Sequence, residues 1–263
     1  MKKYIITCLL LCMPLLFSCS DEVPEGERYE ELAQVEPKRN ILIEDFTGQK
    51  CSNCPEAHQI INDLKALYGD HVVTVAIHAG YFGISENSDP NTIGLMQPEG
   101  NAYAEHWRIA AYPTGIINRV SGPLKHTDWA VYSRQALMKE SQMTIGLNAE
   151  IVDHSIVIHT TLQSSTLLNA KLQLWITESN ITAEQQNGKV KDSNYLHHHV
   201  YRASVNTPWG EDIALKDDTP TTYEHSITLR SNWDANNLSV VAFVYTDTDG
   251  VLEVTEQHVN TNI

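Results

Sequence analysis

Residues 40–55 read Asn-Ile-Leu-Ile-Glu-Asp-Phe-Thr-Gly-Gln-Lys-Cys-Ser-Asn-Cys-Pro. An apolar run leads through a glycine turn into Cys51-Ser-Asn-Cys54, which is the pattern of a buried strand followed by a cysteine pair. Beyond it, apolar residues recur at helical spacing as far as Tyr68-Gly69, where a glycine ends the predicted helix. Residues 71–78 form a second apolar run. Strand, cysteine turn, helix and strand is the order of a parallel βαβ unit.

The cysteine pair is the part of this stretch that bears chemistry. Three of the five cysteines lie in the first nineteen residues, so the remainder of the chain holds only Cys51 and Cys54. A structural zinc site or a disulfide-stapled scaffold would need more ligands or more cysteines. In an exported chain, a lone Cys-x-x-Cys pair indicates redox chemistry. Because a helix start stabilises a thiolate, we expect Cys51 to open the helix and attack, and Cys54 to resolve the mixed disulfide.

The first residues read as an export signal. A positively charged head and an apolar run from Tyr4 to Phe17 precede Ser18-Cys19. We interpret residues 1–18 as a lipoprotein signal peptide, because the run is too short for a good spanning helix. Leu16-Phe17-Ser18-Cys19 resembles a bacterial lipobox, which implies that Cys19 is acylated and anchors the chain in a membrane. An ordinary secreted protein is the alternative.

The residues after the predicted anchor indicate where it is sorted. Ser20 directly after the cysteine fits sorting to an outer membrane, and the acids that follow resemble the export tag of surface lipoproteins. The expected location is therefore the outer membrane, lipid-anchored, and the sequence leaves open whether the chain reaches the cell surface. Residues 19–39 are polar and acidic, as expected of a tether.

Charge excludes one class of partner. The formal net charge is −15, and it becomes −17 without residues 1–18, which carry two lysines and no acids. A chain this acidic is a poor ligand for phosphate backbones, so we expect no nucleic-acid partner. We expect membrane contact through the lipid anchor.

Two further motifs carry a resemblance to a known superfamily. Asp45-Phe46 stands six residues before the first cysteine, and Tyr112-Pro113-Thr114 follows a predicted helix. With these motifs, residues 40–141 resemble the thioredoxin superfamily. We therefore predict an α/β thioredoxin-like domain here, with a polar stretch over residues 80–100 as a loop or short helix beside the active site.

The resemblance also implies roles for individual residues. Pro113 would be cis, and Tyr112, Pro113 and Thr114 would bind an extended substrate. Asp45 would accept the proton that Cys54 releases, although a simple acid at a strand edge is an even alternative. Cys51 and Cys54 would form a reversible disulfide. The Ser-Asn pair between the cysteines leaves the direction of electron flow open.

From residue 142 onward the pattern changes to short strands separated by turn residues, with Asp249-Gly250 as a hairpin signal. An all-β immunoglobulin-like sandwich is expected over residues 142–263. Within it, His197 and His199 of a histidine triplet could share one face of a strand and hold a metal. A polar loop is the favoured interpretation, because a metal site needs a larger ligand set. We expect no metal and no cofactor.

Together, the lipobox, the Cys-x-x-Cys domain and the stretches His-His-His-Val-Tyr-Arg (197–202) and Trp-Gly-Glu (209–211) carry a second resemblance. The mature chain resembles the twenty-eight-kilodalton outer membrane protein family of Gram-negative lipoproteins. That resemblance implies a location and a two-part architecture. It does not imply a settled activity.

Three hypotheses for function follow. The first is thiol–disulfide exchange with protein thiols or disulfides of the cell envelope, which would make the chain an oxidoreductase. The second is a surface binding or adhesion lipoprotein in which the cysteine pair is a structural disulfide. The third is metal delivery, with Cys51, Cys54 and His58 along one helix as soft ligands for Cu(I).

Overall fold

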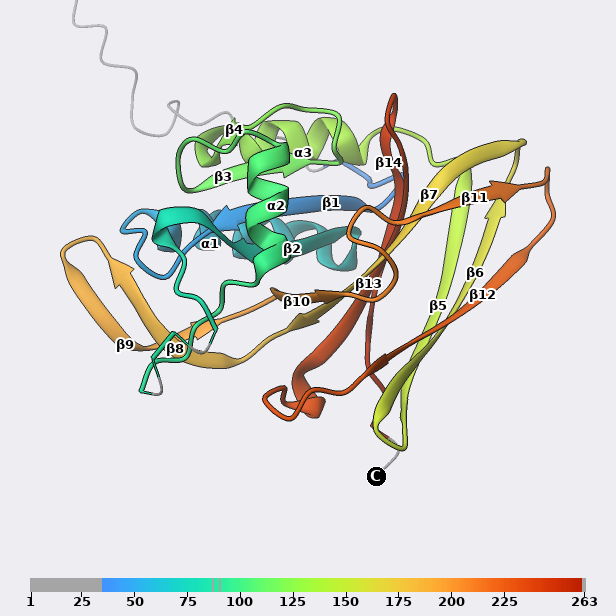
Figure 1. Cartoon of the computed structure of the whole chain (residues 1–263). Helices are drawn as coiled ribbons and strands as arrows, with labels where there is room; N and C mark the ends of the chain where they lie inside the picture. Colours follow the sequence, from blue (N-terminus) through green and yellow to red (C-terminus); the bar gives the residue numbers. More distant parts are fainter. Residues whose placement is uncertain (1–34, 87, 90, 262–263) are drawn as a thin grey trace, which may run out of the picture. The chain divides into compact units, whose positions relative to one another are not determined.

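The computed structural model describes residues 35–86, 88–89 and 91–261 (Figure 1). The predicted signal peptide over residues 1–18, the lipidation site Cys19 and most of the predicted tether lie outside this part. The residues from 35 onward form one compact unit. Within the described ranges, no helix is both long and apolar enough to cross a membrane.

One large sheet dominates the unit (Figure 1). Its strands follow the order β14-β13-β7-β10-β2-β1-β3-β4, and β11 pairs with β7. The central strands β1 and β2 are parallel, whereas β1 and β3 are antiparallel. The bounds are β1 (Ile41–Thr47), β2 (Val72–His78), β3 (Thr114–Ile117), β4 (Leu124–Lys125), β7 (Leu168–Glu178), β10 (Val200–Ser204), β11 (Glu211–Leu215), β13 (Leu238–Thr246) and β14 (Gly250–His258).

Two smaller sheets complete the β structure. One has the order β12-β6-β5, from β5 (Met143–Val152), β6 (Ser155–Ser164) and β12 (Thr221–Thr228). Its apolar face packs on the large sheet, and Ile156 and Ile158 share a buried cluster with Leu172 and Leu174 of β7. The other is an isolated hairpin, β8 (Ile181–Asn187) and β9 (Val190–His197). The described chain is thus rich in strands and has few helices, as the sequence predicted for its second half.

The helices cover both faces of the sheet around β1. They are α1 (Cys54–Tyr68), α2 (Pro98–His106) and α3 (Trp129–Leu137). Every residue of β1 is buried, as expected of a strand with both faces covered. Ile41 and Ile43 point toward α1 and α3, whereas Leu42 and Phe46 share a cluster with residues of α2. Because side chains alternate, Asp45 lies on the α1 face and Glu44 on the opposite face.

The start of α1 differs from the prediction that Cys51 opens the helix. The helix begins at Cys54, with Asn53 before it and Pro55 in its first turn. Residues 48–53 instead form tight turns, closed by a hydrogen bond from the Cys51 amide to the Gly48 carbonyl (2.9 Å). Proline fits a first helical turn because its missing N–H would have had no partner there. Cys51 therefore lies just before the helix, and Cys54 lies within its first turn.

The two predicted domains share one sheet and one core. Their predicted boundary at residues 141–142 falls between α3 and β5, but β10 joins β2 by a parallel bridge between Val200 and Ala76. A buried cluster likewise combines Phe46 from the first half with Trp175 and Phe243 from the second. Contacts between the halves are therefore part of the main core.

Candidate functional site

Cys51 and Cys54 form a disulfide at the N-terminal end of α1, with their Cα atoms 5.5 Å apart. Cys51 is 2% exposed and Cys54 is fully buried. In this conformation, a thiol in solution has almost no access to either sulfur. Any exchange reaction therefore requires the residues that cover the pair to move.

The β8–β9 hairpin is hydrogen-bonded to the backbone of the cysteine loop. The amide of Gln186 donates to the Gln49 carbonyl (2.7 Å), and the amide of Gly188 donates to the Ser52 carbonyl (2.9 Å). The buried side chain of Gln185 donates from Nε2 to the carbonyls of Cys51 (2.9 Å) and Gly48 (3.2 Å). The hairpin thus satisfies carbonyl groups on the cysteine loop that would otherwise need water.

These bonds lead to a prediction about Gln185. Each net hydrogen bond contributes about 0.5–1.5 kcal/mol, so the Gln185→Ala protein should open over the cysteines more readily. We expect its disulfide to be reduced by dithiothreitol about tenfold faster, since about 1.4 kcal/mol corresponds to a factor of ten. The rate is measured by quenching with a thiol-alkylating reagent and counting the labelled cysteines by mass spectrometry.

Gln163→Ala is the matched control for this experiment. Gln163 is an exposed glutamine of β6 whose side chain reaches the Asp218 carbonyl, far along the chain from the cysteine loop. Its reduction rate should equal that of the wild type. Equal rates for the Gln185 and Gln163 variants would show that the hairpin contact does not limit access to the disulfide.

Asp45 lies fully buried on the α1 face of β1, and neither of its carboxylate oxygens accepts a hydrogen bond from the part of the chain that the structure describes. Its nearest ionic partner is His58, whose Nε2 is 3.4 Å from Oδ2. The same Nε2 is 3.2 Å from the Thr47 hydroxyl, and Nδ1 of His58 is 2.7 Å from the hydroxyl of Tyr195 in β9. A histidine from α1 thus connects a buried acid with a phenol from the hairpin.

Tyr112, Pro113 and Thr114 approach the same end of the sheet. The Tyr112–Pro113 peptide bond is cis. Thr114 begins β3 and pairs with Phe46 of β1, two residues before the glycine that starts the cysteine loop. Its hydroxyl donates to the Ala111 carbonyl (2.7 Å), which holds the turn around Pro113. Tyr112 is half-buried and packs its ring edge-on against Phe82, with centroids 5.6 Å apart.

A cavity of about 270 Å³ opens beside Asp45. Five of the titratable side chains that line it are histidines, and the other two are a carboxylate and a phenol: His58, His78, His197, His198, His199, Asp45 and Tyr195. Asp45, His58 and the histidine triplet were predicted from the sequence pattern, whereas His78 and Tyr195 were not. The register of β1 with β2 pairs Thr47 with His78, so a correct strand alignment would have placed His78 near the cysteine loop.

Burial sets the protonation states of the side chains that line the cavity. Burial, and then the neighbouring His197, hold the pKa of His78 well below its usual value. Burial, and next the nearby His58, lower the pKa of His197 to about 4. Burial, and then the charge of Asp45, raise the pKa of Tyr195 to about 12. At neutral pH, His78 and His197 are therefore neutral and Tyr195 keeps its proton.

The candidate metal ligands have other partners. Strand β9 ends at His197, and His199 adopts a positive φ of 54° in the turn that follows, so the two do not alternate along a strand as the metal alternative assumed. Nδ1 of His199 is 3.5 Å from Glu256, and Cys51 and Cys54 are bonded to each other. Among the described residues, no three His, Cys, Asp or Glu side chains are arranged to hold a metal ion.

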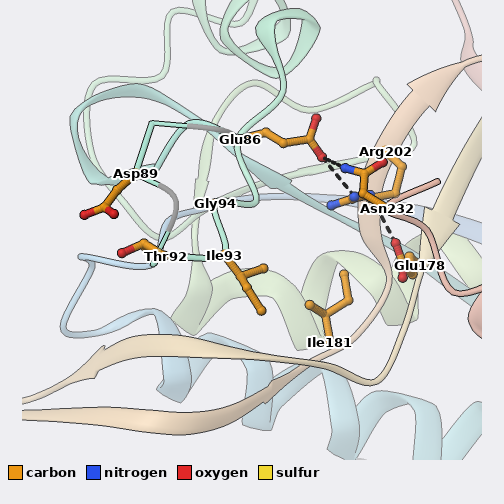
Figure 2. Close-up of a pocket in the computed structure, with 9 residues that line it drawn as sticks. All are labelled: Glu86, Asp89, Thr92, Ile93, Gly94, Glu178, Ile181, Arg202 and Asn232. Carbon is orange, nitrogen blue, oxygen red and sulfur yellow. Dashed lines mark hydrogen bonds and ion pairs between the residues drawn. The ribbon is translucent and has the colours of Figure 1, made fainter. Parts of the chain in front are cut away.

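A second cavity, of about 460 Å³, lies between β8 and a segment that contributes Glu86, Asp89 and residues 92–94. Figure 2 shows Arg202 between two acids at its edge, 3.0 Å from Glu86 and 3.2 Å from Glu178. Asn232 also donates to Glu86 (2.6 Å). Burial raises the pKa of Glu178. Arg202, Glu86 and Glu178 of this cavity pair with one another, so we place the functional site at the disulfide.

Comparisons with known proteins address family and fold. The sequence model of a family described as outer membrane protein Omp28 matches residues 100–263. Among solved structures, HBP35 of Porphyromonas gingivalis is 15% identical, with 85% of this chain and 76% of that chain covered and a TM-score of 0.61. Protein AGR_C_4864 from Agrobacterium tumefaciens is 14% identical, with 84% and 95% covered and a TM-score of 0.54. Both share the fold of most of this chain.

A third structure, of a domain of the outer membrane lipoprotein Omp28 from Porphyromonas gingivalis, is 24% identical. The matched region covers 48% of this chain and 93% of the Omp28 domain, with a TM-score of 0.34. A comparison with curated proteins gave no match.

Proposed function

The chain belongs to the Omp28 family of outer membrane proteins, and from that premise we propose that it is a lipid-anchored outer-membrane protein that carries out thiol–disulfide exchange through Cys51 and Cys54. The family match gives the location, and it begins at residue 100, after the cysteines. The chemistry is therefore argued from the site itself. Acylation of Cys19, which rests on the lipobox, would hold the protein in the membrane.

The observation that carries the proposal is the grouping of three features at one end of the sheet. A cysteine pair lies at the start of α1, a buried acid lies beside that helix, and the Tyr112–Pro113 turn immediately precedes the strand next to β1. We further propose that residues 40–141 are a thioredoxin-like unit and residues 142–263 an immunoglobulin-like sandwich. The parallel β1–β2 pair, antiparallel β3, and helices on both faces support the first assignment.

The reaction would proceed in two displacements. In the reduced protein, the Cys51 thiolate attacks a disulfide of an envelope protein, so that a mixed disulfide forms and one substrate thiolate leaves. The Cys54 thiol then loses its proton to Asp45 and attacks Cys51. The intramolecular disulfide re-forms and the second substrate thiolate is released. Substrate backbone would lie along Tyr112 and Pro113, with Thr114 holding their turn. Run in reverse, the same steps oxidise a dithiol.

A binding or adhesion lipoprotein is the second candidate. It is favoured by the burial of both cysteines under the hairpin, since a structural disulfide needs no access to solvent. In that case the β half would carry the function.

The reduction potential of the pair separates the two candidates. We expect the unlipidated chain, beginning at Ser20, to equilibrate with glutathione buffers at a potential between about −270 and −120 mV, the range of exchange proteins. The fraction of reduced protein is measured by trapping thiols across a series of glutathione ratios. A potential below about −300 mV would identify a structural disulfide and favour the binding protein. A value inside the range would also indicate which way electrons flow.

A further inference from the structure

Helix α1 brings His58 to the same face as Cys54. The two residues are four apart, so they lie one turn from each other along the helix. His58 also has the contact with Asp45 described above, at 3.4 Å from Nε2 to Oδ2. The fully buried carboxylate accepts no hydrogen bond from the described residues. A proton taken up by this acid therefore needs a route away from it, and His58 is next to it.

We propose that His58 carries the proton between Asp45 and solvent when Cys54 resolves the mixed disulfide. The proposal rests on the proposed exchange function and adds a positioned proton carrier to it. His58 does not touch the reacting sulfurs; it acts through Asp45.

The surroundings of His58 suit that role. Its side chain is 18% exposed, whereas Asp45 is completely buried, so the histidine links the acid with water. Both residues line the cavity of about 270 Å³, which has space for several water molecules. The titratable groups that line the cavity with His58 come from β1, β2, β9 and the turn after β9: Asp45, His78, Tyr195, His197, His198 and His199.

The buried neighbours His78, His197 and Tyr195 do not compete for the proton at neutral pH. Burial keeps His78 and His197 uncharged, since both have pKa values far below neutrality. Burial also lowers the pKa of His198, with His199 as the next cause. Tyr195 stays protonated, and its hydroxyl is 2.7 Å from Nδ1 of His58. When Nε2 is free to accept a proton from Asp45, Nδ1 carries the hydrogen of the neutral ring and donates it to the Tyr195 oxygen. The same bond persists when the ring is protonated, so Tyr195 can hold the ring in both states.

The resolving step moves one proton and exchanges one sulfur–sulfur bond for another. The Cys54 thiol gives its proton to Asp45, and the Cys54 sulfur attacks Sγ of Cys51. A bond between the two cysteines forms, the bond from Cys51 to the substrate sulfur breaks, and the substrate leaves as a thiolate. Asp45 passes its proton to Nε2 of His58, and the histidine releases it to water in the cavity. Asp45 is then ionised again for the next turnover.

The test is a single-turnover reaction of the reduced full-length mature protein with oxidised glutathione. Samples are acid-quenched, alkylated and analysed by mass spectrometry, so that formation and decay of the mixed disulfide are measured separately from about pH 5.5 to 8. In the His58→Gln protein, we expect the mixed disulfide to form at the wild-type rate and to decay about tenfold more slowly near neutral pH. This loss is smaller than the roughly 10²–10⁴-fold effect of removing a direct general acid or base. The pH dependence of the decay should also flatten.

His126→Gln is the matched control. His126 is 20% exposed, and its Nε2 lies 3.7 Å from Glu56 of α1. It therefore resembles His58 in exposure and in having an acidic partner. Its decay rate and pH profile should match the wild type. Tyr195→Phe keeps the His58 ring but removes its hydroxyl partner, and we expect about a threefold slower decay with an altered pH profile. This variant tests the proposal if His58→Gln does not fold.

The outcomes separate this inference from the function on which it rests. A wild-type protein that forms no mixed disulfide would overturn both. A wild-type protein that exchanges, together with a His58→Gln protein whose decay rate and pH profile are unchanged, would overturn the role of His58 alone. Slower decay in both the His58 and His126 variants, with no change in pH profile, would show a structural effect and also reject the proposal.

Discussion

Replacing Arg119 with methionine is expected to lower the free energy of unfolding by about 3–5 kcal/mol, the range for breaking a buried ion pair from one side. Arg119 makes two bonds to Glu44, at 2.9 and 3.1 Å, and the side chains are 4% and 0% exposed. Burial, the largest single cause, acts to lower the pKa of Arg119, but the charge of Glu44, its hydrogen bonds and the nearby Tyr245 and Tyr103 together raise that pKa. Without the guanidinium, Glu44 would remain buried and unpaired. Urea denaturation followed by circular dichroism measures the loss.

The aromatic surroundings of Arg119 add to this effect. The guanidinium carbon lies 5.4, 4.8 and 4.5 Å from the ring centroids of Trp175, Phe243 and Tyr245. These rings belong to β7 and β13, whereas Glu44 belongs to β1, so one side chain joins the two predicted halves of the chain. We therefore expect the variant to lose stability in both halves together.

Two controls test whether the loss of stability in Arg119→Met comes from the buried ion pair. Lys38 pairs with Glu140 at the surface, with 51% and 72% of their side chains exposed, so Lys38→Met should cost no more than about 1 kcal/mol. Adding Glu44→Gln to Arg119→Met removes the uncompensated charge and should restore part of the lost stability. If Arg119→Met and Lys38→Met were equally stable, the buried pair would not hold the halves together.

Replacing Cys51 with serine is expected to abolish dithiol exchange. A serine hydroxyl is not ionised at neutral pH, so the variant lacks the nucleophile that forms the mixed disulfide. Cys54→Ser should behave differently, because Cys51 would still attack but nothing would resolve the product. The Cys54 variant should therefore accumulate a stable mixed disulfide with oxidised glutathione. Intact-protein mass spectrometry distinguishes the two results by the added glutathione.

The pair of cysteine variants also tests the assignment of roles. Both substitutions remove the same disulfide, so an effect of losing that crosslink would be equal in the two proteins. If Cys51→Ser accumulated the mixed disulfide instead, then Cys54 would be the attacking residue. Unchanged exchange in Cys51→Ser would contradict the proposed function and favour the binding lipoprotein.

Local patterns in the sequence predicted much of the local structure. The apolar run after Asn40 becomes β1, the helical spacing after the cysteines becomes α1, and the alternating stretches beyond residue 142 become strands. The prediction of the outer membrane protein family is confirmed by the match over residues 100–263. These predictions succeed because side-chain periodicity and turn residues act over a few neighbours. The helix α1 begins three residues later than predicted, at Cys54 instead of Cys51, because residues 48–53 form tight turns.

The tertiary structure alone decided what surrounds the cysteines. Gln185 contacts Cys51 across 134 positions of sequence, and Tyr195 contacts His58 across 137. No local pattern encodes such pairs, because they depend on how the β8–β9 hairpin folds back from the large sheet. Tertiary packing likewise decides three other features: the burial of the disulfide, the neutral state of the cavity histidines and the Glu44–Arg119 ion pair.

The sequence by itself thus determined β1, most of α1, the cysteine pair and the family, since each depends on residues close together in the chain. Only the tertiary structure decided whether those cysteines are accessible, which groups share a cavity with Asp45, and how firmly the two halves are joined. Accessibility, pKa and ion-pair strength depend on burial, and burial is a property of the whole packed chain.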